Sequence, residues 1–294
     1  MKKALLVTGL VFVLLIAWGA ISVYQSFLTP PPIDVERDIV YGKGGDEELK
    51  LDLAKPKQDK GPYPAVVCLH GSGWRFGTRQ EMNGIMESLA HMGYVGVTVS
   101  YRLAPAAQFP AQIEDIKAAV RWLRANSEKY QINRDRIGVV GFSAGGHLAC
   151  LLGATDAKDG LEGNGGNPEQ SSRVQAVVSF CGPTDFTTRD WPEDVEKGLV
   201  EPFLGGTFKD KPEVYKRASP INYVTADDPP FLLIHGIKDP LIPVDQAKRF
   251  LDKLQEAGVS VQLNLENGGH GWEGPAMERS VREILSFLDE RLKH

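Results

Sequence analysis

One serine stands in a spacing that suits nucleophilic catalysis. Residues 141–145 read Gly-Phe-Ser-Ala-Gly, which places Ser143 in a G-x-S-x-G pattern. A strand-like apolar run, 137–142, precedes it, and a helix-like run, 144–154, follows it. A sharp turn from strand to helix strains the backbone of the serine, and glycines on either side avoid collisions. The pattern predicts an exposed Ser143 hydroxyl and an Ala144 N–H aimed at negative charge developing on a bound carbonyl oxygen.

Such a serine needs a base to accept its proton and a third group to orient that base. For this motif the order along the chain is serine, acid, histidine. Of the six histidines, only His270 follows the acid candidates in a loop, within Gly-Gly-His-Gly-Trp at 268–272. The others precede the acid candidates, lie on helix-like runs or end the chain. We therefore predict that His270 is the base.

Two aspartates compete for the role of the acid. Asp239 follows the strand-like run 231–235, and Asp185 follows the run 174–180. A carboxylate after the later strand can hold the ring of His270 in the right tautomer. We interpret Asp239 as the acid and Asp185 as a side chain that fixes its own turn.

A second loop is a candidate for binding the oxyanion. The buried strand-like run 65–69 ends in His-Gly-Ser-Gly-Trp at 70–74. A glycine-containing loop after a central strand can turn its N–H groups toward the nucleophile. Ser72 and Gly73 are the candidate donors, and the alternative is a tight turn without a role in binding.

The remaining pattern alternates between strands and helices. We expect edge strands at 39–41 and 49–55, buried strands at 95–99 and 261–265, and helices at 80–92, 245–257 and the C-terminus. A helix starting near Pro110 has an apolar stripe that predicts packing on the sheet, with its polar remainder in water. Residues 156–172 read as a surface loop, and the Pro- and Trp-rich segment 186–228 as an excursion over the site.

The N-terminus reads as an export element. Lys2 and Lys3 precede an uncharged, mostly apolar stretch, 4–23, which is about long enough to span a bilayer. We expect residues 1–32 to be a signal or membrane-anchor segment with its linker, an uncleaved anchor being favoured, and residues 33–294 to be one catalytic domain. That domain would lie outside the cytoplasm, either anchored or periplasmic or secreted.

Composition excludes some classes of function. The formal net charge is −5 and no basic run suggests a phosphate-binding face, so nucleic acid is not an expected partner. No metal or organic cofactor is expected. Cys68, Cys150 and Cys181 lie in or beside apolar runs, which favours buried free thiols; a Cys68–Cys181 bridge is the alternative.

Several stretches together resemble a known family. They are the serine motif with the following Gly-His-Leu-Ala, the 70–74 loop, Tyr-Arg-Leu-Ala-Pro at 101–105, Phe-Pro-Ala-Gln-Ile-Glu-Asp at 109–115, the glycine-rich 161–168 loop and Gly-Pro-Thr-Asp at 182–185. The chain resembles α/β-hydrolase esterases of the hormone-sensitive-lipase-like group, and most closely carbohydrate esterases similar to bifunctional acetylxylan and feruloyl esterases. The resemblance covers roughly residues 35–290.

The resemblance implies an α/β-hydrolase fold: a mostly parallel central sheet flanked by helices, with a small excursion over the active site. It implies a catalytic triad of Ser143, Asp239 and His270, and an oxyanion hole from Ser72, Gly73 and Ala144. One residue departs from the family, because Ser72 replaces the middle glycine of the usual His-Gly-Gly-Gly-Trp.

The expected function is a serine carboxylesterase acting on a small ester or an esterified carbohydrate. A serine peptidase similar to the prolyl-oligopeptidase catalytic domain shares the order of the triad, but the residues before the first strand leave no room for a propeller. A non-catalytic interaction module on the same fold is the other alternative. Such modules typically lack a triad member, whereas all three candidates are present.

Overall fold

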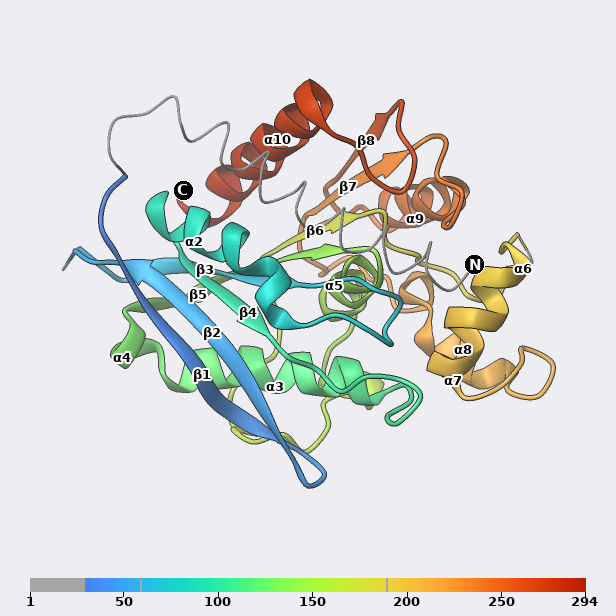
Figure 1. The fold of residues 1–294 in the computed structure, drawn as a ribbon, viewed down its shortest axis with the longest axis horizontal. Coiled ribbons are helices and arrows are strands. Elements are labelled where there is room, and N and C mark those ends of the chain that lie inside the picture. The colour runs from blue at the N-terminus through green and yellow to red at the C-terminus, as the bar shows by residue number, and fades with distance from the viewer. Residues whose placement is uncertain (1–29, 59, 189) are drawn as a thin grey trace.

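One eight-stranded sheet runs through the described part of the protein (Figure 1). The computed structural model describes residues 30–58, 60–188 and 190–294. The strands are β1 (Ile33–Gly44), β2 (Glu47–Pro56), β3 (Tyr63–Leu69), β4 (Val95–Val99), β5 (Ile132–Phe142), β6 (Ala176–Phe180), β7 (Phe231–Gly236) and β8 (Val261–Glu266). Their spatial order is β1-β2-β4-β3-β5-β6-β7-β8.

Six neighbouring strands of this sheet are parallel. The pairs from β4 through β3, β5, β6 and β7 to β8 are all parallel, whereas β1 pairs with β2 and β2 with β4 in antiparallel fashion. This is the mostly parallel sheet that the sequence predicts. Because parallel strands end at the same edge, the loops after β3, β5, β6, β7 and β8 meet there, which is where ligands bind in such sheets.

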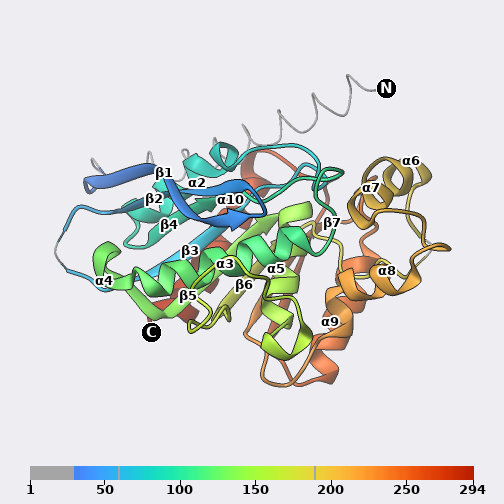
Figure 2. The same ribbon diagram turned by 90° about the horizontal axis from the view of Figure 1, so that it is seen from below.

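Helices cover both faces of the sheet. One face packs against α2 (Asn83–His91) and α10 (Gly274–Leu292), and the other against α3 (Ala111–Ala125), α5 (Ala144–Ala154) and α9 (Asp245–Glu256). Figure 2 shows α3 and α5 in front of the sheet. The strands alternate between the two cores: Val67 joins the α3 and α5 side, and Val66 joins the α10 side. Apolar side chains on both strand faces are what a doubly covered sheet requires.

The polar side of α3 differs from the prediction. We expected its charged residues to face water, but Asp115 and Lys117 are buried. The Asp115 carboxylate accepts bidentate hydrogen bonds from the Arg102 guanidinium, with the shortest N–O distance at 2.7 Å. Lys117 Nζ lies 2.7 Å from Glu162 Oε1, so the loop after α5 covers this face of α3. A charge can be buried in this way because it is paired.

The segment 186–228 leaves the alternating pattern, as the sequence predicts. It contains α6 (Glu193–Val195), the π-helical turn η3 (Glu196–Val200), α7 (Glu201–Leu204), α8 (Pro212–Ala218) and the 3-10 turn η4 (Pro220–Asn222). Both ribbon views place α6, α7 and α8 together at one end of the molecule, on the same side as α9 (Figures 1 and 2). The remaining short elements are η1 (Arg79–Met82), α4 (Ser127–Tyr130) and η2 (Ala157–Asp159).

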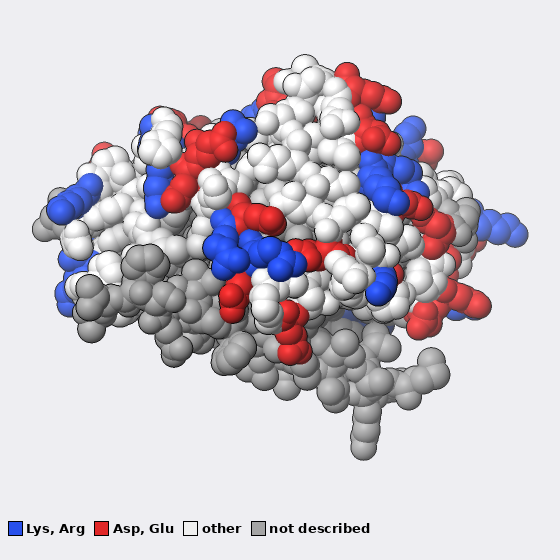
Figure 3. Space-filling model, turned by 90° about the horizontal axis from the view of Figure 1, so that it is seen from above, with Lys and Arg blue, Asp and Glu red and all other residues white. Residues whose placement is uncertain are grey.

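The sequence also gives expectations for the N-terminal segment, the three cysteines and the surface charges. The candidate N-terminal anchor, 4–23, falls outside the described residues, and within the described part no helix is long and apolar enough to span a membrane. Cys68, Cys150 and Cys181 are buried free thiols, as predicted, and the alternative bridge does not form. On the face shown in Figure 3, Lys and Arg side chains are interspersed with Asp and Glu.

Candidate active site

The turn between β5 and α5 holds Ser143 in a strained conformation. Its φ is 54° and its ψ is −116°, a backbone conformation that residues with a Cβ rarely adopt. A Cβ at Gly141 would come within 2.0 Å of the Gly145 oxygen, and one at Gly145 within 2.3 Å of the Leu69 oxygen. The two glycines are therefore needed for strand, turn and helix to approach so closely.

The three predicted triad side chains form one hydrogen-bonded line. His270 Nε2 lies 2.8 Å from Ser143 Oγ, and His270 Nδ1 lies 2.7 Å from Asp239 Oδ2. A carboxylate only accepts hydrogen bonds, so Nδ1 carries the proton and Nε2 is left to accept the serine proton. The side chain of His270 is 15% exposed and that of Asp239 is 0% exposed, which leaves the imidazole as the solvent-facing member of the pair.

The carboxylate of Asp239 is held by its own turn. Its Oδ1 accepts the N–H groups of Leu241 and Ile242 at 2.9 and 3.0 Å. Burial alone would raise the pKa of Asp239, but hydrogen bonds from His235 and His270 outweigh burial and hold its pKa well below the usual range. The acid therefore stays ionised and faces the imidazole with a full charge.

The loop that carries His270 is docked onto the turn of the acid. Lys238 N donates to the Gly268 oxygen at 2.9 Å, and a Cβ at Gly236 would lie 2.0 Å from the Gly269 oxygen. Trp272 then packs on Phe180, with ring centroids 4.6 Å apart. The close backbone contact at Gly236 brings His270 over the end of β7, between the acid and the serine.

The predicted oxyanion donors lie on two loops at the same sheet edge. Ser72 and Gly73 follow β3 with φ of 70° and 63°, and Ala144 begins α5. Within the described ranges, the N–H groups of Ser72, Gly73 and Ala144 donate to no protein acceptor. The left-handed backbone at Ser72 explains why a glycine is the usual residue there, because a Cβ is strained in that conformation.

Comparison with known proteins identifies the family of this chain. The BD-FAE family model matches residues 51–254. The chain belongs to the BD-FAE family. Esterase LipC of Mycobacterium tuberculosis is 37% identical over 263 residues, which cover 86% of this chain and 64% of LipC. The BD-FAE chain therefore spans less than two thirds of the length of that relative.

Solved structures show the same fold. A truncated carbohydrate esterase from gut microbiota superposes with a TM-score of 0.80 at 28% identity, covering 91% of the BD-FAE chain and 99% of that chain. A bifunctional GH43-CE protein of Bacteroides eggerthii superposes with a TM-score of 0.78 at 32% identity, covering 88% of this chain and 35% of that chain. The architecture is that of the α/β-hydrolase esterases.

The rival acid has a different role in the BD-FAE chain. Asp185 Oδ1 accepts the backbone N–H and the hydroxyl of Thr187, at 2.9 and 2.6 Å. The side chain of Gln246 binds both backbone groups of Asp185, with its Oε1 at 2.8 Å from the Asp185 nitrogen and its Nε2 at 2.9 Å from the oxygen. Asp185 thus fixes the loop after β6.

Sequence reasoning missed a histidine behind the candidate nucleophile. His147, on α5, accepts a hydrogen bond from Trp74 Nε1 at 3.1 Å through Nδ1 and donates to the Ala218 oxygen at 2.7 Å through Nε2. Burial lowers the pKa of His147 to about 4, so the ring is neutral and can serve both partners. The Gly-Gly-His that follows the serine is the available sequence signal, but it does not reveal those partners.

The segment 186–228 contacts the loop of the candidate oxyanion donors at three successive residues. The side chain of Leu199 lies against Gly73, where a Cβ would come within 2.7 Å of Leu199 Cδ2. The ring of Trp74 stacks on Phe203 with centroids 4.4 Å apart, and Arg75 donates to the Gly198 oxygen. The turn η3 and helix α7 thereby support the loop that carries Ser72 and Gly73.

One group of metal-binding side-chain types occurs in the described part of the BD-FAE chain. Ligand atoms of Cys181, His235 and Asp239 lie within 4.8 Å of one another. Burial, and then the Asp239 carboxylate, raise the pKa of the Cys181 thiol far above its usual value. The carboxylate of Asp239 already accepts hydrogen bonds from His270 and from the N–H groups of Leu241 and Ile242, so this buried group suits a support for the candidate acid better than a metal site.

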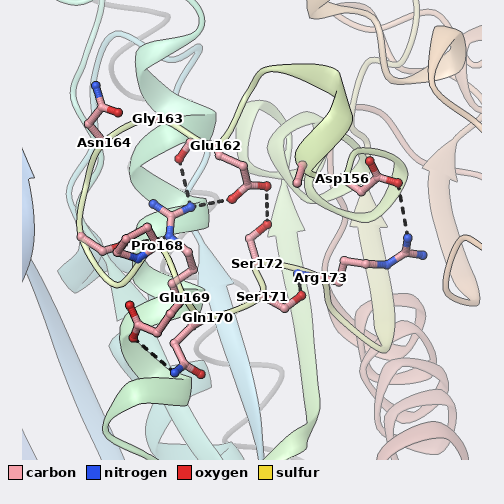
Figure 4. A pocket seen from close by; sticks show the side chains of 13 residues that line it. Asp156, Glu162, Gly163, Asn164, Pro168, Glu169, Gln170, Ser171, Ser172 and Arg173 are labelled. Atoms are coloured by element: carbon pink, nitrogen blue, oxygen red, sulfur yellow. Dashed lines mark hydrogen bonds and ion pairs between the residues drawn. The ribbon is translucent and has the colours of Figure 1, made fainter.

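A separate open cavity of about 670 Å³ lies between α3 and the loop 156–173 (Figure 4). Two ion pairs lie in its lining: Arg121 is 2.6 Å from Glu162, and Arg173 is 3.6 Å from Asp156. None of the three triad candidates lines it. The cavity lies near the start of β6, at the edge of the sheet opposite the serine.

Proposed function

We propose that the chain is a serine carboxylesterase that works through an acyl-enzyme. The observation that carries this proposal is the continuous line from Asp239 through His270 to Ser143, beside loop N–H groups without protein acceptors. The names of LipC and of the carbohydrate esterase from gut microbiota support the same chemistry.

In the proposed reaction, Ser143 Oγ attacks the ester carbonyl while His270 Nε2 takes the hydroxyl proton. The negative charge that develops on the carbonyl oxygen is stabilised by N–H groups of Gly73 and Ala144, and by that of Ser72, with the N-terminus of α5 behind them. His270 then gives its proton to the leaving alcohol. Asp239 stays ionised throughout and stabilises the imidazolium.

Deacylation repeats these steps with water. A water molecule next to His270 loses its proton to Nε2 and attacks the acyl-serine carbonyl. The same N–H groups stabilise the second tetrahedral intermediate, which collapses to release the acid and return the proton to Ser143 Oγ. Water can reach this point because the His270 side chain is partly exposed, while Asp239 is shielded.

We propose esterified carbohydrates, with acetyl or feruloyl groups, as the substrate class. The support is the relation to proteins described as carbohydrate esterases, together with the resemblance in the sequence. We also propose that residues 33–294 form the catalytic domain and that residues 4–23 export or anchor it, so that polymers outside the cytoplasm are within its reach.

The test is a comparison of esters with amides. Purified full-length protein is assayed with p-nitrophenyl acetate, acetylated xylan, methyl ferulate and the p-nitroanilide of acetic acid. The proposal expects hydrolysis of the esters and little of the anilide, and release from xylan or ferulate above that from the small acetate supports the carbohydrate assignment. Faster cleavage of the anilide would favour the prolyl-oligopeptidase-like peptidase, and no cleavage of any substrate would favour the non-catalytic module.

A further inference from the structure

Cys181 occupies a strained position next to the proposed acid. It follows the last residue of β6, between the strand that leads to Ser143 and the strand that leads to Asp239. Its φ is 51°, and its backbone N–H donates to the Ile234 oxygen at 2.8 Å. A residue with a Cβ persists in such a conformation only where its surroundings enforce it, and such positions gather at functional sites.

The strained backbone brings the thiol to the carboxylate of the acid. The Cys181 sulfur lies within 4.8 Å of ligand atoms of both His235 and Asp239, and all three side chains are at most 1% exposed. Burial, and then the neighbouring negative charge of Asp239, raise the pKa of this thiol, which therefore keeps its proton. A protonated thiol has an S–H that can donate a hydrogen bond to a neighbouring carboxylate.

His235 is a second group at the same carboxylate. Its Nε2 donates to the Ile242 oxygen at 2.9 Å and lies 3.4 Å from Asp239 Oδ2. Three titratable groups thus face the acid from three elements: Cys181 from the end of β6, His235 from β7, and His270 from the loop after β8. Only His270 takes part in the proton transfers described above.

We propose that Cys181 is a positioning residue of the triad, whose S–H donates to the Asp239 carboxylate and keeps one oxygen directed at His270. The inference rests on the proposed function, because it assigns Asp239 to the triad. Without the donor, the carboxylate is still fixed by its own turn and by His270, but it loses one of the groups that align it with the imidazole. It also becomes more basic, which favours the protonated form of His270.

The chain offers a matched control for the loss of a buried thiol. Cys68, in β3, is fully buried, and burial raises its pKa to about 12. It lies on the α10 side of the sheet and is not part of the group around Asp239. Replacing Cys68 with alanine removes the same atom from a core without touching the acid.

The experiment compares Cys181→Ala, Cys181→Ser and Cys68→Ala with the wild-type full-length protein. Alanine and serine both keep the Cβ, so the backbone strain at position 181 is unchanged. Hydrolysis of p-nitrophenyl acetate gives kcat, KM and the pH dependence of kcat/KM, and thermal unfolding gives stability. Ser143→Ala is included as the inactive reference.

The proposal expects Cys181→Ala to lower kcat about tenfold, the effect of one modest hydrogen bond to a charged group, with KM little changed. The acid limb of its kcat/KM profile moves to higher pH. Cys181→Ser keeps a donor, so its kcat and the acid limb of its kcat/KM profile lie closer to those of wild type. Cys68→Ala changes only the unfolding temperature.

Two results would overturn the inference: a Cys181→Ala profile like that of wild type, or equal kinetic losses in Cys181→Ala and Cys68→Ala. If Cys181→Ala does not fold, Cys181→Ser decides, because a tenfold loss in this donor-keeping variant would contradict the role. Equal hydrolysis by wild type and Ser143→Ala would instead contradict the proposed function itself.

Discussion

Trp74 Nε1 donates to His147 Nδ1 across 3.1 Å, and this contact joins the proposed oxyanion loop to the helix behind the nucleophile. Because the second nitrogen of His147 donates to the Ala218 oxygen, the same ring also reaches the end of α8. Three segments around Ser143 thus depend on one neutral imidazole. Protonation of Nδ1 would replace the acceptor with a donor facing the indole N–H.

This arrangement predicts a loss of stability in acid. The pKa of His147 is lowered by burial from 6.5 to about 4, so between these values the unfolded chain binds more protons than the folded one. The contribution of neutral His147 to the free energy of unfolding is complete above pH 6.5 and is lost as the pH falls toward 4. It amounts to about 3 kcal/mol. His147→Gln, which keeps an acceptor and a donor but does not titrate, should flatten the dependence of the unfolding free energy on pH in this window. An equally steep dependence in the variant would contradict the assignment.

Ser72 offers two possible oxyanion donors, its backbone N–H and its hydroxyl, and one substitution distinguishes them. With φ at 70°, the residue is strained in a way that glycine is not. If the N–H is the oxyanion donor, Ser72→Gly keeps kcat near wild type and raises the unfolding temperature slightly. A loss of about 10²-fold in kcat, typical of a lost oxyanion donor, would show that the hydroxyl carries the role.

The two aspartates should respond differently to the same change. Asp239→Asn lowers kcat by about 10⁴, because an amide does not hold the ring of His270 in the required tautomer. Asp185→Asn leaves kcat near wild type and lowers the unfolding free energy by about 1 kcal/mol through its weakened bonds to Thr187. Steady-state kinetics and denaturant titration of both variants check this, and the reverse order of kinetic effects would make Asp185 the acid.

Leu199 should limit the length of the acyl group. Its side chain lies against Gly73, next to the proposed oxyanion donor. Leu199→Ala should therefore raise kcat/KM for p-nitrophenyl hexanoate relative to the acetate by about tenfold, the scale of added apolar contacts in a pocket. Leu251→Ala is the control, since Leu251 is similarly half-buried but lies on α9. An unchanged acyl preference in Leu199→Ala would place this side chain outside the acyl site.

The fold and the candidate triad could be predicted because their signals are local. The G-x-S-x-G spacing, the apolar runs and the order of serine, acid and histidine each require only short stretches of sequence. The first strand was predicted too short, as 39–41 instead of Ile33–Gly44, because residues 34–38 are all exposed and only Val35 among them is apolar. Such a stretch gives no alternating apolar pattern.

The partners of buried polar groups could not be predicted in the same way. Lys117 was expected in water because its charge is visible in the sequence, whereas Glu162, which pairs with it, lies 45 residues away. The hydrogen bond of Trp74 to His147 and the placement of Cys181 near Asp239 also join segments that are distant along the chain. Such pairs depend on how strands and loops are ordered in space, and a single sequence does not give this.

The most direct test of the account is the role of Ser143. Hydrolysis of p-nitrophenyl acetate is measured with wild-type protein and with Ser143→Ala, after circular dichroism has shown that both are folded. The account predicts that kcat falls by about 10⁶, as when the serine of such a triad is removed. A Ser143→Ala protein that retains a tenth or more of the wild-type rate would contradict it.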